Sequence, residues 1–96
     1  FSHRGAVLQT GDQSLLVDGE KLPLSKNEYR ILWTLLQDKG KIVSREKLME
    51  ALWQTDSFVD ENTLNVNVGR LRRKLEAAGL PDFIRTRKGV GYLVED

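Results

Sequence analysis

Short apolar runs separated by turn-forming residues occupy the first quarter of the chain. These runs are Ala6–Gln9, Ser14–Val17 and Glu20–Leu24. Asp18-Gly19 joins the last two, and a two-residue connection of this kind favours a β-hairpin because glycine tolerates positive φ. Pro23 suits an edge strand, because proline has no N–H to donate to a neighbouring strand. The pattern predicts an antiparallel N-terminal sheet.

Three helices are predicted after this sheet. Ser25 and Glu28 have the spacing of a capping box, which marks the start of the first helix. Apolar residues spread over a broad arc of residues 29–36 and predict a core helix that stops near Gly40. The other two helices are expected over Arg45–Trp53, capped by Ser44, and over residues 60–78, capped by Asp60 and ended by Gly79.

The C-terminal segment has the pattern of a β-hairpin. Phe83–Arg87 and Gly91–Val94 alternate in character around Lys88-Gly89-Val90, and residues 41–43 are expected to form only a short extended link. The predicted fold class is therefore α+β, in the order β-β-β-α-(β)-α-α-β-β. Two helices and a basic hairpin after a core helix are the parts of a winged helix-turn-helix.

The helix predicted over residues 60–78 has two faces of opposite character. At about 100° per residue, a narrow apolar stripe is formed by Leu64, Val68, Leu71 and Leu75. The opposite face carries no carboxylate and consists of Asn62, Thr63, Val66, Gly69, Arg70 and Arg73. Arginine and asparagine bind guanine and adenine edges, and a valine methyl group contacts the thymine methyl. This face favours DNA binding, although a solvated surface helix with one exposed valine is the alternative.

The net charge of +1 conceals a basic segment. Residues 70–88 contain seven basic and two acidic residues, a charge of +5, whereas the remainder has eight basic and twelve acidic residues, a charge of −4. In the hairpin, Arg85 and Arg87 are expected to point to one side and Ile84 to the other, with Lys88 at the tip. A basic tip suits a narrow minor groove, where negative potential is concentrated. The alternative is a solvated helix face followed by a polar hairpin.

Length and composition exclude several other classes of protein. The 96 residues correspond to a single domain, with 40% hydrophobic and 30% charged residues. There is no cysteine and His3 is the only histidine, so no disulfide, zinc site, other metal site, cofactor or histidine-based catalytic centre is expected. No apolar run approaches the roughly 20 residues of a membrane span, and no signal peptide is seen, which favours a cytoplasmic protein. Asp60-Glu61 is explained by helix capping, so an enzyme is disfavoured.

A set of motifs covering nearly the whole chain resembles the DNA-binding effector domain of OmpR/PhoB-family response regulators of two-component systems. The runs that carry the resemblance are residues 22–25 (LPLS), 28–32, 43–48 (VSREKL), 52–53, 59–60, 63–68 (TLNVNV), 70–75 (RLRRKL) and 84–92 (IRTRKGVGY). The sequence of residues 60–68 is similar to that of the family branch that controls resistance to cell-wall-active peptide antibiotics in Gram-positive bacteria.

The resemblance implies a role for each candidate site residue. It implies helix 60–78 in the major groove and wing 84–94 in the adjacent minor groove. The residues expected at or near bases are Asn62, Thr63, Val66, Arg70 and Lys88. Those expected at the DNA backbone are Ser44, Arg45, Trp53, Asn67, Arg72, Arg73, Thr86, Arg87 and Tyr92. The expected RNA polymerase contact loop comprises Gln54, Thr55, Asp56, Ser57 and Phe58, whereas Val59 is expected to pack beneath it.

The resemblance also implies partners outside this chain. The domain is expected to be the C-terminal part of a longer protein, following a receiver domain that an upstream histidine kinase phosphorylates. Phosphorylation is expected to produce a homodimer that binds promoter direct repeats in double-stranded DNA, about 10–11 bp apart.

Four positions differ from the residues that are common in the family: Asn62, Gly69, Arg87 and Lys88. The detailed groove contacts are therefore expected to differ. A winged helix used only for protein contacts is the alternative function.

Overall fold

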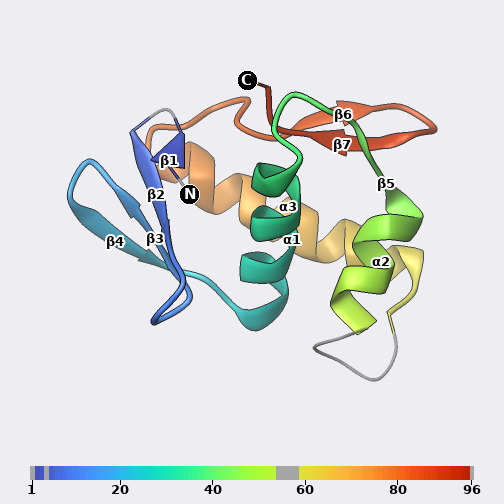
Figure 1. The fold of residues 1–96 in the computed structure, drawn as a ribbon, viewed down its shortest axis with the longest axis horizontal. Helices are drawn as coiled ribbons and strands as arrows, with labels where there is room; N and C mark the ends of the chain where they lie inside the picture. Colours follow the sequence, from blue (N-terminus) through green and yellow to red (C-terminus); the bar gives the residue numbers. More distant parts are fainter. Residues whose placement is uncertain (1, 4, 54–58, 96) are drawn as a thin grey trace.

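The computed structural model describes residues 2–3, 5–53 and 59–95. Its elements follow the order β1 (Ser2–His3), β2 (Ala6–Gln9), β3 (Ser14–Val17), β4 (Glu20–Pro23), α1 (Lys26–Gln37), β5 (Val43–Ser44), α2 (Arg45–Trp53), α3 (Glu61–Ala77), β6 (Arg85–Arg87) and β7 (Gly91–Leu93). The α+β winged-helix prediction is confirmed. In Figure 1 the four-stranded sheet lies at one end of the long α3, and α2 and the β6–β7 wing lie toward the other.

The N-terminal sheet is an antiparallel meander in the order β1-β2-β3-β4. Its tight turn is at Asp18 and Gly19, which both have positive φ (49° and 84°), as a two-residue hairpin turn requires. Pro23 lies on edge strand β4, opposite Ser14. The two-residue strand β1 was not predicted, because a segment this short has no alternation to read.

The start of α1 and the end of α3 follow from local sequence. Ser25 and Glu28 form the predicted capping box at the start of α1. That helix ends at Gln37, before the expected stop at Gly40. At the C-terminal end of α3, Leu80 N–H donates to the carbonyl of Leu75 and Gly79 N–H donates to the carbonyl of Glu76. Together with the positive φ of Gly79 (89°), these two hydrogen bonds form a Schellman motif.

One hydrophobic core joins all three helices to both sheets. Nine of its members have no solvent exposure at all: Leu15, Ile31, Leu32, Leu35, Leu48, Leu52, Leu64, Leu71 and Val94. The predicted stripe of α3 is buried throughout, since Val68 and Leu75 are almost fully covered as well. Burial of this stripe fixes which face of α3 points outward.

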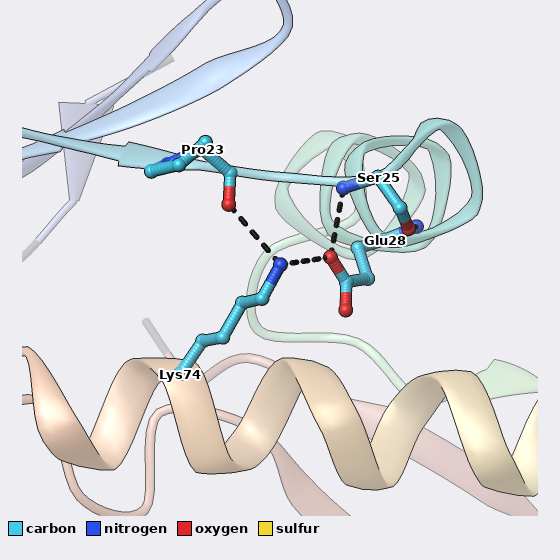
Figure 2. A network of polar contacts seen from close by, with 4 residues as sticks. All are labelled: Pro23, Ser25, Glu28 and Lys74. Atoms are coloured by element: carbon cyan, nitrogen blue, oxygen red, sulfur yellow. Dashed lines mark hydrogen bonds and ion pairs between the residues drawn. The ribbon is translucent and has the colours of Figure 1, made fainter.

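A buried carboxylate ties α1 to α3 (Figure 2). Glu28 is only 2% exposed, and its Oε1 accepts hydrogen bonds from Ser25 N–H at 2.8 Å and from Lys74 Nζ at 2.6 Å. Lys74 also donates to the backbone carbonyl of Pro23 at 3.2 Å. Burial would raise the pKa of Glu28, but the hydrogen bonds from Lys74 and Ser25 outweigh it and hold that pKa below its usual value.

The segment expected to be only an extended link is strand β5 in a second sheet. This sheet has the order β5-β7-β6, with Val43 opposite Tyr92 and Ser44 opposite Gly91. A Cβ atom on Gly91 would overlap the carbonyl oxygen of Val43 and the Cα atom of Ser44. The wing therefore attaches to the start of α2 through an approach that only glycine permits.

Gly91→Ala is expected to destabilise the fold by about 2 kcal/mol, because the added methyl group forces β5 and β7 apart. Urea denaturation measures this change. Gly11→Ala is the matched control, since Gly11 has open space around it and an ordinary φ. Equal stabilities of the two variants would contradict the close approach.

Lys74→Met is expected to lower the free energy of unfolding by about 2 kcal/mol at pH 7, because it leaves the buried Glu28 carboxylate without its cation. The folded-state pKa of Glu28 lies below its unfolded value of 4.5, so this carboxylate stabilises the fold above pH 4.5. That stabilisation is lost as the pH falls through the folded-state pKa. Denaturation between pH 7 and pH 3 should therefore show a smaller Lys74→Met effect at the acidic end, and a constant effect would contradict the pairing.

Candidate nucleic-acid interface

The outward face of α3 begins directly after a capped N-terminus. Asp60 Oδ1 accepts the backbone N–H of Thr63 at 2.8 Å, as predicted for the helix cap. This hydrogen bond holds the pKa of the Asp60 carboxyl below its usual range. The cap carboxylate is therefore occupied by the helix end, which leaves the outward face to the neutral and cationic groups that follow.

Most of the residues predicted to read bases lie together on that outward face. Asn62, Val66 and Arg70 are exposed, and Thr63 is half-buried at the edge of the face. Val66 is 42% exposed, although an aliphatic side chain of this size is normally covered. An exposed methyl-bearing residue among amide and guanidinium groups suits the edges of base pairs in a major groove.

Asn67 lies elsewhere than its predicted role suggests. It is only 8% exposed, and its Nδ2 donates to the carbonyl of Thr63 at 2.9 Å. The residue lies on the side of α3 that turns toward the core. One of its amide protons is thus used within the helix rather than presented to a ligand.

Tyr92 is the centre of a cationic cluster that joins α2, α3 and the wing. The guanidinium carbons of Arg45 and Arg72 lie 5.7 and 5.5 Å from its ring centroid. Its hydroxyl donates to Asn65 Oδ1 at 3.1 Å, and Arg72 also donates to the hydroxyl of Thr86. We call these five residues the wing-root cluster. It brings together four residues that were predicted to be at the DNA backbone.

Asn65 is the member of the wing-root cluster that the sequence reasoning missed. Asn65 and Arg72 are seven residues apart, so they lie on the same side of α3 two turns from each other. That spacing was the available signal, but nothing in the sequence places Tyr92 against it. The pairing appears only once β7 is packed beside the helix.

Two buried nitrogen atoms in the wing-root cluster lack hydrogen-bond acceptors. Within the described part of the chain, Nε of Arg45 and Nε of Arg72 are buried and have no hydrogen-bond partner. Buried donors of this kind are costly when left unsatisfied. The cluster therefore combines two positive charges with unfilled donor capacity, which suits an anionic ligand such as phosphate.

The wing presents its cations toward solvent, as predicted. Ile84 is buried, whereas Arg85, Arg87 and Lys88 are exposed. Arg85 pairs with Glu95 at 2.9 Å, but among the described residues Arg87 and Lys88 have no ion pair. The unneutralised charge of the wing is thus concentrated at its tip.

The residues at the two ends of α2 are engaged within the chain. Ser44 Oγ accepts Lys47 N–H at 3.1 Å and so caps α2. The Trp53 ring is 56% exposed, but its indole N–H donates to the carbonyl of Val59 at 3.2 Å. Val59 is buried, as expected for packing beneath the loop. The predicted polymerase loop, residues 54–58, lies outside the described residues.

Arg73 is the remaining predicted backbone residue. It is exposed on the outward face of α3, one turn after Arg70.

In residues 2–3, 5–53 and 59–95, no group of three His, Asp or Glu side chains is placed to hold a metal ion. No helix within those ranges is both long and apolar enough to cross a membrane.

A family profile matches most of the chain. Residues 19–94 match the family described as "Transcriptional regulatory protein, C terminal". The sensory transduction protein BceR of Bacillus subtilis is 44% identical over 92 residues, which are 96% of this chain and 40% of BceR. The chain thus spans about two fifths of the length of this relative. The resemblance to the OmpR/PhoB family is confirmed.

Solved structures with the same fold include domains bound to DNA. The C-terminal domain of the nisin resistance regulator NsrR, a lantibiotic response regulator, has a TM-score of 0.86 and 43% identity, covering 99% of this chain and 96% of that one. The DNA-binding domain of response regulator AdeR, in complex with an intercistronic region, has a TM-score of 0.88 and 26% identity, covering 100% and 99%. Similarity to NsrR agrees with the peptide-antibiotic-resistance branch predicted from residues 60–68.

Proposed function

Because the chain belongs to the family of C-terminal domains of transcriptional regulatory proteins, we propose that it is the DNA-binding output domain of a response regulator and reads double-stranded DNA with α3. The observation that carries this proposal is the outward face of α3, which lacks carboxylates and exposes Val66 beside Arg70. The family is one of DNA-binding regulators rather than of enzymes.

The proposed reading of bases uses two elements. In the major groove, Arg70 donates to a guanine edge and Val66 contacts a thymine methyl group, while Asn62 and Thr63 flank them. In the adjacent minor groove, Lys88 enters from the tip of the wing. Arg70 and Lys88 are both exposed, and no ion pair within the described residues neutralises either of them.

The proposed contacts to the DNA backbone divide into two kinds. Arg45, Arg72, Arg73 and Arg87 supply positive charge, and the first two bring it to the wing-root cluster, where their guanidinium groups lie over the Tyr92 ring. Thr86 and Tyr92 hold the guanidinium of Arg72. Ser44, Trp53 and Asn67 use their polar groups within the chain. These three residues are proposed to shape the surface in the free domain and to contact the DNA backbone when bound DNA rearranges those hydrogen bonds.

The whole protein is proposed to work as a phosphorylation-controlled dimer in the cytoplasm. An N-terminal receiver domain, phosphorylated by a histidine kinase, would pair two copies on promoter direct repeats. Two domains in tandem on one face of the duplex need half-sites about one helical turn apart, ~10–11 bp. Residues 54–58 are proposed to contact RNA polymerase.

Selection from a random duplex library tests the proposal. We expect enrichment of a short motif whose binding weakens as salt rises. Retention without enrichment, or no retention at low salt, would contradict sequence reading. The second of these results would favour the alternative function, a winged helix that contacts only proteins.

Arg70→Ala is expected to weaken binding to the selected site by about 1–3 kcal/mol and to relax the preference at one base pair. Lys88→Ala should weaken binding as well, through the wing. Fluorescence anisotropy with matched and single-mismatch duplexes measures both effects. Lys26→Ala is the control, because it removes one exposed positive charge at the start of α1. Equal losses in all three variants would indicate a nonspecific charge effect.

A further inference from the structure

Gly69 lies in the middle of α3, where the fold gives no reason for a glycine. An ideal Cβ atom built on it meets nothing within 4 Å. Its φ is not positive, unlike that of Gly79 or Gly89, so an L-residue would fit without strain. Glycine inside a helix is destabilising relative to alanine because it loses more backbone freedom on folding. The missing side chain therefore weakens the helix without relieving a contact within the described chain.

Gly69 lies at one edge of the outward face. On a helical wheel it falls about 60° to one side of Val66, while Thr63 falls about 60° to the other. A helix seated in a major groove presents the centre of such a face to the bases and its edges to the two DNA backbones. Gly69 is thus placed where one sugar–phosphate strand would pass.

The surroundings of this edge are those of an anion site. Asn65 and Arg72 lie one turn before and after Gly69, on the side that leads to the wing-root cluster. Arg72 and Arg45 contribute two guanidinium groups there, and among the described residues their buried Nε atoms have no partner. The nearest carboxylate beyond Gly69 on this edge of α3 is that of Glu76, two turns further along.

We propose that one strand of the DNA passes directly over Gly69, and that the absence of a side chain there lets its phosphate groups reach the wing-root cluster. This inference rests on the proposed function and adds the strand's path to it. Gly69 sets how deeply α3 enters the groove, and so determines whether Val66 and Arg70 reach the bases. At this position the glycine lowers the stability of α3 but lets the DNA strand come close to the helix.

Gly69→Ala and Gly69→Leu test this proposal in the same chain. Gly69→Ala should raise the melting temperature by about 4 °C, because alanine is the better helix former. The same variant should raise the dissociation constant for the selected duplex by about tenfold, and Gly69→Leu should raise it further, because each side chain holds the strand away. The plot of log affinity against log salt concentration should also become less steep, by the amount that corresponds to the loss of about one phosphate contact. Gly11→Ala adds the same methyl group in the distant β2–β3 turn and should leave the affinity unchanged.

The possible results separate this inference from the proposed function. If the wild-type chain retains no duplex, the proposed function fails. If the wild-type chain binds and Gly69→Ala is more stable but binds equally well, the strand does not pass over Gly69 and this inference alone is overturned. Weaker binding by Gly69→Ala with an unchanged salt slope would also overturn it, because the contact would then be with a base rather than with phosphate.

Discussion

The ion pair between Glu28 and Lys74 is the constraint on which the orientation of α3 depends. A carboxylate that is 2% exposed must keep its cation and its hydrogen bonds, since an unpaired charge in the core is strongly unfavourable. Glu28 is also half of the capping box of α1, and Lys74 reaches the carbonyl of Pro23 at the end of β4. One side chain of α3 is thereby fixed to the first turn of α1 and to the sheet that precedes it (Figure 2).

The contacts that hold the buried side of α3 determine which of its faces stays exposed. The leucine stripe packs against α1 and α2, and Lys74 restrains the helix near its C-terminal end. The wing restrains the other side, where Tyr92 meets both Asn65 and Arg72. With three sides of the helix held, only the face centred on Val66 stays free. The exposed valine is a consequence of this arrangement, because no element of the described chain is left to cover it.

Local rules were sufficient wherever a residue acts on its own neighbours. The Asp18-Gly19 turn, the caps at Ser25 and Asp60, the glycine stop at Gly79 and the leucine stripe were all readable from sequence, because spacing along the chain decides them. Contacts between distant segments were not readable. The pairing of β5 with β7 depends on the close approach at Gly91, and the burial of Asn67 depends on how α3 is rolled. The wing-root cluster needs three elements to converge on one tyrosine.

The same distinction applies to Gly69 in α3, whose place on the outward face was readable from sequence, whereas the absence of any packing reason for it was not. Sequence places Gly69 on the outward face, yet the spacing alone does not tell a glycine required by packing from one that packing leaves unexplained. The structure separates the two cases, because Gly91 is crowded by β5 whereas Gly69 faces open space. A crowded glycine is explained by the fold that surrounds it. An uncrowded one in a helix interior costs stability, so its explanation lies in whatever approaches that surface from outside.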